Sequence, residues 1–502
     1  MRISRLALPC WAIAAVLSLG SDADAAELRA GAAKVDITNR DAGPVNDPLY
    51  AKALVLTDGT TTAAIVTVDA VAIAEIGSIP NSYLANVRAK LQQSLKLDPK
   101  HLLINASHCH GIVRADIEAR TVRAVEEAYR NLVPVNAGAG AGREDRIMEN
   151  RRLKLKDGTD SDVRHAYSLP PDEEVTEAGP VDPEIGILRL DRKDGRPLAV
   201  IYNFACHPIQ GVPSGGNTAD IIGFASRTIE ENLGEGATAL FLQGCGGDIN
   251  PIGYKDFDHP RNAEPLGNLL GLSALRAIRA IACKPVEHFA IRNETLPLPR
   301  ADLAQRIAER EAEQLRLVQS LQGTTLNLKA FLPLAVKYGL SGETPSAPAA
   351  HYFREKAMDR HDLAKLDADN RANIKQYAAN IITMERLTRL QTNLALLKKH
   401  QARNRASGSK TIDVEVAGLR VGDFRLVTFP GELTVRIGLN IKKRAPQPST
   451  FVAGYTNGYI YYAPTEEQLK NAGGAQEDSD CLLGPGWQAL FETRALDLLK
   501  GL

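Results

Sequence analysis

Strand-like and helix-like segments alternate over residues 27–135, and this order constrains the chain to an α/β fold. "KALVLTDGTTTAAIVTVDAVAI" holds two β-rich runs around Asp58-Gly59, a dipeptide typical of hairpin turns. "SYLANVRAKLQQSLKL" and "DIEARTVRAVEEAYRNL" have helical spacing, and "HLLINAS" between them predicts a short buried strand. Strand–helix–strand order of this kind indicates a layered α/β domain.

The same character continues to residue 299. The Gly-, Pro- and charge-rich stretch Ala137–Val181 predicts loops. "EIGILRLDRKDGRPLAVIYNFACHP" predicts two strands joined by a turn at Asp194-Gly195, and "FASRTIEENL" predicts a helix. "ATALFLQGCGGDINP" predicts a strand that runs into a Gly-rich loop. We therefore assign residues 27–299 to the first part of one α/β domain.

Residues 300–410 depart from this pattern. "LAQRIAEREAEQLRLVQSL" and "NIKQYAANIITMERLTRLQTNLALLKKHQA" are charged, rich in Ala and Leu, and helical in period, with the linker-like "GETPSAPAAHYF" between them. β-character returns in "TIDVEVAGLRVGDFRLVTFPGELT", which predicts a hairpin about Gly422-Asp423, and a helix ends the chain. We interpret residues 300–410 as a helical insertion and residues 411–502 as the second part of the α/β domain.

The first residues predict export. Arg2 and Arg5 precede the mostly apolar run Leu6–Leu19, and Ala23-Asp24-Ala25 fits a small-x-small cleavage site. The apolar run is too short to span a bilayer, which needs roughly 20 apolar residues. We expect a signal peptide over residues 1–26 and a periplasmic or secreted protein. A frayed cytosolic N-terminus is the alternative.

The charge balance gives no overall attraction to two kinds of partner. Lys and Arg total 60, as do Asp and Glu, so the net charge is zero and nothing attracts the whole chain to nucleic acid or to anionic lipid. Five cysteines remain after the signal segment, too few for a disulfide scaffold. These are Cys109, Cys206, Cys245, Cys283 and Cys481.

Two histidines stand close together in "NASHCHG". If "HLLINAS" is a strand, His108 and His110 lie at or just past its end and point into one cleft, because residues i and i+2 share a face. Sites in α/β folds form where strands end. The alternative is a pair of solvated loop histidines.

Four more motifs carry polar groups near strand ends. "NFACHP" places His207, "GCGGDINP" places Asp248 and Asn250, and "TFPGELT" places Glu432 after a turn. Each has an ordinary structural explanation when taken alone. Together, two imidazoles, a carboxylate and a phenol oxygen form a ligand set that suits zinc. The phenols come from "GYTNGYIYYAP": Tyr455, Tyr459, Tyr461 and Tyr462.

The ordered set "ASHCHG", "NFACHP", "GCGGDINP", "FPGELT" and "GYTNGYIYYAPTEEQ" resembles the neutral (non-lysosomal) ceramidase family of zinc amidohydrolases. The likeness runs through most of the chain in the same order. It implies a layered mixed-sheet catalytic domain and one Zn2+ per chain. The implied ligands are His108, His207, Glu432 and Tyr462, with Tyr461 as the alternative if the register slips by one.

The resemblance also implies roles for neighbouring residues. His110 would contact the bound water or the substrate, and Arg151 of "MENRRL" would help to bind the reacting group, with Arg152 adjacent. Asp248 and Asn250 would shape the loop that faces the substrate.

The chain also departs from the family pattern. Asn250 precedes Pro251 where the family carries a serine, so zinc-bound water is the expected nucleophile. "EEQLKNAGGAQ" lacks a tyrosine expected there, and residues 300–410 match nothing in the family. The chain also ends near the end of the catalytic region, without the immunoglobulin-like C-terminal domain. It thus resembles a divergent, short, bacterial-type member.

Three hypotheses for function follow. The first is an exported zinc-dependent hydrolase that cleaves an amide bond in a small amphipathic or N-acylated, lipid-like substrate. The second keeps the zinc site but acts on an ester or glycosidic bond, and the third is a non-catalytic zinc- or ligand-binding relative. Peripheral contact with a membrane is compatible with the first. The cysteines beside the motifs are expected to be core residues or a disulfide pair rather than ligands.

Overall fold

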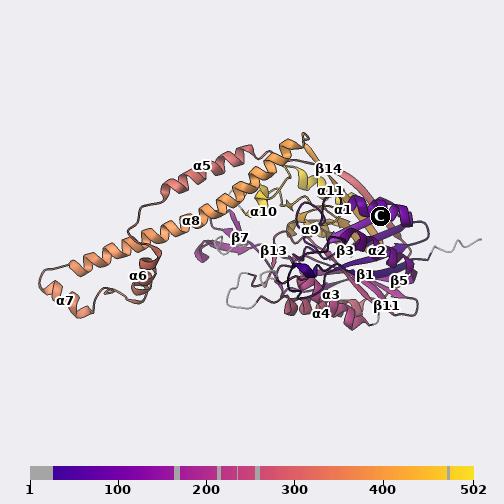
Figure 1. The fold of residues 1–502 in the computed structure, drawn as a ribbon, viewed down its shortest axis with the longest axis horizontal. Coiled ribbons are helices and arrows are strands. Elements are labelled where there is room, and N and C mark those ends of the chain that lie inside the picture. The colour runs from indigo at the N-terminus through magenta and orange to yellow at the C-terminus, as the bar shows by residue number, and fades with distance from the viewer. Residues whose placement is uncertain (1–26, 163–169, 212–215, 235, 255–260, 472–474) are drawn as a thin grey trace, which may run out of the picture.

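The computed structural model describes residues 27–162, 170–211, 216–234, 236–254, 261–471 and 475–502. The chain forms an α/β body from which a long helical arm projects (Figure 1). The expected signal peptide, residues 1–26, lies outside the described residues. Among the helices of the described ranges, none is both long enough and apolar enough to cross a bilayer.

A mixed eight-stranded sheet forms the centre of the body, and a mixed sheet is what the family resemblance implies. The hairpins at Asp58-Gly59 and Asp194-Gly195 are both present. Two pairs of neighbouring strands are parallel: β3 (Thr62–Val68) with β4 (Leu102–Ala106), and β11 (Pro197–Phe204) with β12 (Thr238–Gln243). The strands, in sheet order, are β12 (Thr238–Gln243), β11 (Pro197–Phe204), β10 (Glu184–Arg192), β5 (Val133–Arg143), β1 (Arg29–Asp36), β2 (Tyr50–Thr57), β3 (Thr62–Val68) and β4 (Leu102–Ala106).

The large sheet bends where β1 meets β5, because these strands share only two residue pairs. The bend brings β12 back against the other half of the sheet. Thr67 Oγ1 donates to the carbonyl oxygen of Phe241 at 2.5 Å, and Asn105 Oδ1 accepts from the backbone N of Gln243 at 2.9 Å. The carboxyl ends of β4 and β12 therefore lie side by side, and the loops that follow them meet.

Alternate residues of each central strand face two different cores, which explains why these strands are apolar on both faces. On β2, Leu54 and Leu56 enter a core between the two halves of the sheet, whereas Ala53 and Val55 pack beneath helices. The helices that cover the outer faces are α1 (Tyr83–Leu95) and α2 (Ile117–Arg130) on one half, and α3 (Asp220–Leu233) and α4 (Ala263–Ala280) on the other.

A second sheet completes the layers. Leu419 and Leu426 face the central core, while Val414 and Val427 face the last helices of the chain. The hairpin at Gly422-Asp423 is present, with Gly422 at a φ of 59°. This sheet holds β14 (Phe289–Pro299), β15 (Thr411–Val421), β16 (Phe424–Thr428) and β18 (Thr450–Ala453), and α9 (Val435–Arg444) and α11 (Trp487–Lys500) cover it.

The prediction that Ala137–Val181 is a loop region is wrong for much of its length. The glycines of β5 serve packing rather than turns: a Cβ on Gly138 or Gly140 would lie 2.5 or 2.8 Å from Ile281. Small residues thus let β5 approach the end of α4. The strands in this stretch are β5, β6 (Met148–Asn150), β7 (Arg152–Leu155), β8 (Asp160–Asp162) and β9 (Val175–Ala178).

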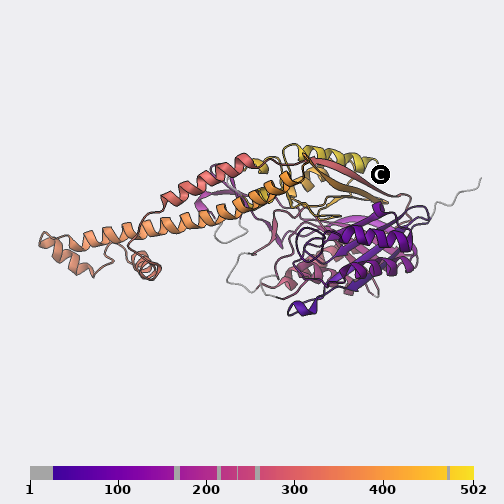
Figure 2. The same ribbon diagram turned by 45° about the horizontal axis from the view of Figure 1, so that its top comes forward.

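The helical region forms the arm, seen from two directions in Figures 1 and 2. Its longest helix, α8, has 45 residues and so measures about 67 Å at 1.5 Å per residue. Helix α7 occupies part of "GETPSAPAAHYF", which is therefore more than a linker. The arm helices are α5 (Ala304–Ser320), α6 (Leu328–Leu340), α7 (Ala349–Ala357) and α8 (Asp362–Ala406).

Candidate metal centre

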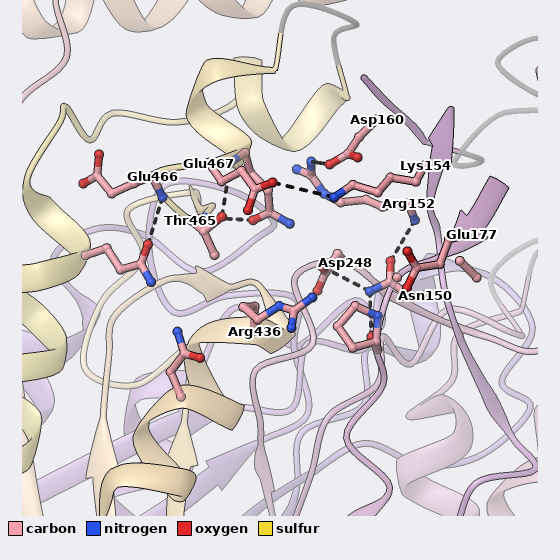
Figure 3. Close-up of a pocket in the computed structure, with 16 residues that line it drawn as sticks. Asn150, Arg152, Lys154, Asp160, Glu177, Asp248, Arg436, Thr465, Glu466 and Glu467 are labelled. Atoms are coloured by element: carbon pink, nitrogen blue, oxygen red, sulfur yellow. Dashed lines mark hydrogen bonds and ion pairs between the residues drawn. The ribbon is translucent and has the colours of Figure 1, made fainter. Parts of the chain in front are cut away.

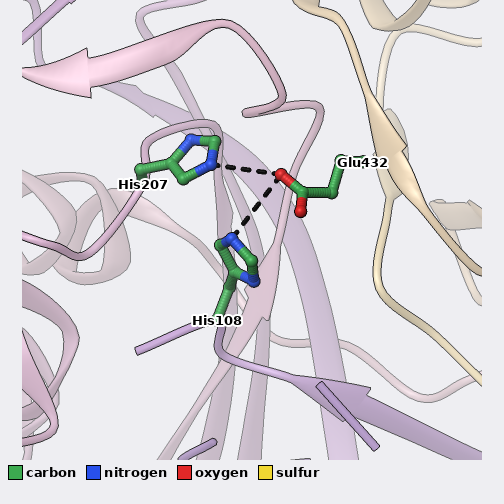
Figure 4. Close-up of side chains that lie close together, drawn as sticks. All are labelled: His108, His207 and Glu432. Carbon is green, nitrogen blue, oxygen red and sulfur yellow. Dashed lines mark hydrogen bonds and ion pairs between the residues drawn. The ribbon is translucent and has the colours of Figure 1, made fainter. Parts of the chain in front are cut away.

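His108, His207 and Glu432 come together from three distant parts of the chain. One ligand atom from each lies within 4.8 Å of the others, and all three side chains are buried. The Oε2 atom of Glu432 lies 3.1 Å from Nε2 of His207 and 3.6 Å from Nε2 of His108 (Figure 4). Of the histidines, cysteines and acids in the described ranges, these form the one group of three with metal-binding spacing.

Backbone carbonyls fix the orientation of both imidazoles. Nδ1 of His108 lies 2.6 Å from the carbonyl oxygen of Val71, and Nδ1 of His207 lies 3.0 Å from that of Ile249. A carbonyl oxygen only accepts hydrogen bonds, so each Nδ1 carries the proton. Each Nε2 therefore presents a lone pair toward Glu432, which is the arrangement that metal-ligating histidines adopt.

His108 follows β4 on a turn rather than within the strand. Its backbone has a φ of 68°, a left-handed conformation, and its N–H donates to the carbonyl oxygen of Ala70 at 3.0 Å. His207 follows β11, and its N–H donates to the same Ile249 carbonyl that accepts from its ring. Both histidines therefore lie just past strand ends, as the sequence predicts.

Glu432 is positioned by a short ladder and a close-packed glycine. In β17 (Glu432–Leu433) it pairs in parallel with Tyr462 of β19 (Tyr462–Ala463). A Cβ on Gly247 would lie 2.7 Å from the carbonyl oxygen of Glu432, so only glycine fits there. The "GCGGDINP" loop thereby packs directly against the strand that carries the acid.

Two tyrosines donate hydrogen bonds to Glu432, a role that the sequence does not assign. The hydroxyl of Tyr455 lies 3.1 Å from Oε2, and the hydroxyl of Tyr459 donates to Oε1. Burial acts to raise the pKa of Glu432, but the neighbouring imidazoles and Tyr459 outweigh it and hold that pKa below its usual range. The tyrosine cluster was visible in the sequence, but nothing there indicated which carboxylate it contacts.

These residues fit a divalent metal ion. Burial lowers the pKa of His108 to about 4, so its ring is neutral at pH 7. Two imidazole lone pairs then face a buried carboxylate, and a cation between them would convert this unfavourable contact into three ligand bonds. A donor set of two imidazole nitrogens and one carboxylate oxygen is typical of zinc.

Arg151 forms hydrogen bonds with Tyr462 and Asn250, the residues expected beside the metal. Its Nη2 lies 3.2 Å from the hydroxyl of Tyr462, and its Nη1 lies 3.1 Å from Oδ1 of Asn250. Glu477, which the sequence did not indicate, forms a buried ion pair with Arg151, in which Oε1 lies 2.6 Å from Nε. Arg152 instead forms a buried ion pair with Asp478. Arg151, rather than its neighbour, is thus the arginine beside the expected tyrosine ligand.

His110 lies at the exposed side of the site. Its ring is exposed and its centroid is 5.8 Å from that of His108, in an edge-to-face arrangement. Cys109 between them is fully buried in the core beneath α1 and α2. The two histidines of "NASHCHG" are therefore split between a buried position and an accessible one.

Asp248 has a structural position. Its Oδ1 accepts from the backbone N of Val435, the first residue of α9, at 2.7 Å, and its Oδ2 accepts from Asn150 at 3.3 Å. A carboxylate at a helix N-terminus is favourable. The group fixes α9 and β6 next to the centre.

A polar cavity of about 540 Å3 lies on the Asp248 side of the centre. Its lining includes Asn150, Arg152 and Asp248 (Figure 3), and of the described residues that line it none belongs to the His108–His207–Glu432 cluster. The ion pair of Lys154 with Glu467 crosses this region. The cavity is therefore lined by charged side chains and lies next to the metal centre without including any of its three residues.

Tyr461 contacts the arm instead of the cluster. Its hydroxyl accepts a hydrogen bond from Arg403 of α8, and Arg403 also pairs with Glu75. His400 packs edge-to-face on the Tyr461 ring with centroids 4.6 Å apart, and its Nε2 lies 2.6 Å from Asp480. The base of α8 thus holds the residue next to Tyr462.

The five described cysteines are all free, so the expected alternative of a disulfide pair is excluded among them. Cys109, Cys206 and Cys245 are buried in three different cores. They are core residues, the other alternative that the sequence left open.

Comparisons with solved structures assign the fold of the chain. No family model matches the chain, and no curated protein matches it. A solved structure of a ceramidase complexed with C2 superposes with a TM-score of 0.60 at 17% identity, covering 94% of this chain and 75% of that one. The neutral ceramidase from Pseudomonas aeruginosa gives 0.58 at 17% identity, over 95% and 75%.

The chain has the neutral ceramidase fold. The expectation of a layered α/β fold of this type is confirmed. At 17% identity the neutral ceramidase fold by itself defines architecture, and the chemistry must be argued from the residues.

Proposed function

We propose that this protein is an exported, zinc-dependent hydrolase that cleaves the amide bond of an N-acylated, lipid-like molecule. The observation that carries the proposal is the buried cluster of His108, His207 and Glu432, with both Nε2 lone pairs directed at the carboxylate, on a neutral ceramidase fold. Tyr462 would supply the fourth ligand, since it is paired with Glu432 across the β17–β19 ladder.

A zinc ion held by these residues supplies a Lewis acid that polarises a carbonyl group and makes water nucleophilic at neutral pH. Arg151 is buried and remains cationic, because Glu477 and Tyr462 raise its pKa against the opposing effect of burial. Its guanidinium is held by Asn250 and by the carbonyl of Gly247. It would stabilise the negative charge that develops on the substrate oxygen.

The side-chain amide of Asn250 has a hydrogen-bond donor that no described group accepts. Its Oδ1 accepts from Arg151, while its Nδ2 is buried and makes no hydrogen bond to a described group. A buried donor without a partner costs stability, so a substrate oxygen that accepts from it would be bound favourably. The family serine is thereby replaced by a residue that can orient a substrate but cannot act as a nucleophile.

His110 is the accessible acid–base group of the proposal. It contacts the ring of His108 and is exposed at the surface of the site. A neutral imidazole can accept the proton of the attacking water and return it to the leaving amine. This transfer is what amide cleavage requires, because an amine leaves only after protonation.

Export belongs to the proposal and is supported by the sequence of residues 1–26 alone. N-terminal sequencing of protein secreted or released from the periplasm would test it. A mature chain that begins at Ala26 or Glu27 supports export, and an intact Met1 on active protein contradicts it.

The test of the reaction is a substrate panel. Purified protein with zinc is assayed on an N-acylsphingosine, the matching O-acyl ester and an aryl glycoside. The proposal predicts that amide hydrolysis dominates and that His207→Ala reduces it by at least about 1,000-fold. Ester or glycoside cleavage without amide cleavage would support the second hypothesis instead, and no turnover of any of the three would support the third.

A further inference from the structure

The arm carries most of the exposed large apolar side chains of the described residues. Twelve of eighteen exposed large hydrophobic side chains lie between Leu315 and Met384, although the arm is a minor part of the chain. Several are more than half exposed, including Leu340 at 84% and Phe353 at 73%. Water-exposed apolar groups gathered in one region mark an interaction surface.

Helix α6 presents the most regular part of this surface. Leu328, Leu332, Val336 and Leu340 follow one another at four-residue intervals, so they form a stripe along one side of the helix. Their exposed fractions are 57%, 53%, 59% and 84%. We call these four residues the α6 stripe.

The opposite side of α6 is already occupied by α8. Phe331 stacks on Tyr377 with ring centroids 4.5 Å apart, and the hydroxyl of Tyr338 donates to Asp367 at 2.9 Å. The helix is therefore fixed to the arm by one face and displays the other. The stripe does not result from a helix that has failed to pack.

The charged residues of α6 indicate which kind of partner binds the α6 stripe. The helix contains Lys329 and Lys337 and no acidic residue. Pairing of two α6 stripes in a dimer would gather four ammonium groups from the two helices without a carboxylate from either, which is unfavourable. Anionic headgroups beside an apolar layer complement both the stripe and the lysines.

We propose that the α6 stripe, with Lys329 and Lys337, docks the arm onto an anionic lipid bilayer. The helix would lie in the interface with its four apolar side chains among the acyl chains and its lysines at the headgroups. Figures 1 and 2 show α6 beside the outer half of α8, away from the body, with α7 at the far end of the arm. The base of α8 touches Tyr461, so one helix connects the docking surface to the tyrosine loop.

This inference goes beyond the proposed hydrolysis and does not depend on it, since docking is measured without turnover. The full chain is sedimented with vesicles of phosphatidylcholine, with or without phosphatidylglycerol. We expect the wild type to sediment with the anionic vesicles. Leu332→Ser/Val336→Ser should reduce the bound fraction by about 10-fold or more, because apolar burial drives insertion.

Three further variants sharpen the test. Lys329→Glu/Lys337→Glu should abolish the preference for anionic vesicles. Leu340→Ser changes the most exposed residue at the helix end, where the fold is least at risk, and should weaken binding several-fold. Leu272→Ser/Leu490→Ser removes exposed apolar groups from the body and should bind like the wild type.

The proposal is overturned if the wild type does not sediment with anionic vesicles, or if both stripe variants bind as well as it does. It is also overturned if light scattering of the lipid-free protein shows a dimer that Leu340→Ser dissociates, because the stripe is then a contact between copies. Circular dichroism of each variant checks the helical content.

Discussion

Nε2 of His207 lies 3.1 Å from Oε2 of Glu432, although the two residues are 225 positions apart in the chain. The loop after β12 makes the contact possible, because its Ile249 carbonyl holds His207 and its Gly247 lies against the backbone of Glu432. The bend of the large sheet at β1–β5 brings the end of β4, and with it His108, to the same place. The centre is thus a product of the whole layered fold rather than of any one motif.

His110, the exposed histidine beside the centre, should contribute to turnover without binding the metal. We predict that His110→Ala lowers kcat by about 100-fold or more and leaves the zinc content unchanged, because a general acid–base contributes this much and His110 is exposed. His288→Ala, another exposed histidine, is the control. Steady-state kinetics with metal analysis checks this. Loss of zinc in His110→Ala would mean that it is a ligand.

The base of the arm should position the tyrosine loop. Arg403 binds both Tyr461 and Glu75, so Arg403→Ala should free the residue next to Tyr462. We predict a fall of about 10-fold in kcat, with KM little changed, as for a modest displacement of reacting groups. Arg405→Ala, an exposed neighbour, should match the wild type. Equal activity of both variants would show that the contact does not influence the centre.

Gly247 should tolerate no side chain. A Cβ there would lie 2.7 Å from the carbonyl oxygen of Glu432, so Gly247→Ala must displace backbone. We expect a loss of about 2 kcal/mol in the free energy of unfolding, measured by urea denaturation, together with weaker metal binding. Gly323→Ala, where a Cβ meets open space, is the matched control. An unaltered Gly247→Ala protein would contradict the described packing.

Ionised Glu144 should stabilise the folded protein, so the free energy of unfolding should fall when this carboxylate is protonated at acid pH. Burial acts to raise its pKa, but Arg146 and Ser273 outweigh this and lower it from 4.5 to about 2. A lowered carboxyl pKa adds stability that is present above about pH 5 and is lost as the pH falls toward 2. Arg146 is 60% exposed, so we expect only about 1 kcal/mol from the pair.

The corresponding measurement is the free energy of unfolding of wild type and Glu144→Gln from pH 2 to 7. The difference should be largest above pH 5 and should disappear near pH 2. Glu173→Gln, at an exposed acid, should show no such trend. A difference that grows as the pH falls would have the wrong sign for this account.

Much of the fold followed from local sequence patterns. Turn dipeptides such as Asp58-Gly59 and Gly422-Asp423 identified hairpins because few residues adopt the required backbone conformation. The sequence did not predict β5, because its glycines are required by close packing against Ile281, which is distant in the chain. Local sequence patterns carry no information about such a partner. The bend of the large sheet was equally beyond local reasoning.

The centre was predictable in part. The expected positions of His108, His207 and Glu432 depended on a family resemblance, and the structure brings these three together. The sequence did not indicate that Tyr455 and Tyr459 bind Glu432, or that Glu477 pairs with Arg151, since these contacts depend on the register of distant loops. The catalytic roles of His110, Arg151 and Asn250 remain predictions.

The metal content of the purified protein shows whether His108, His207 and Glu432 bind zinc. Protein purified without added metal, and again after incubation with zinc and gel filtration, is analysed by inductively coupled plasma mass spectrometry beside His207→Ala and His288→Ala. We predict about one zinc per chain for the wild type and His288→Ala, and less than about one tenth for His207→Ala. A wild-type chain that retains no zinc, or a His207→Ala chain that retains as much as the wild type, would show that these residues do not form a zinc site.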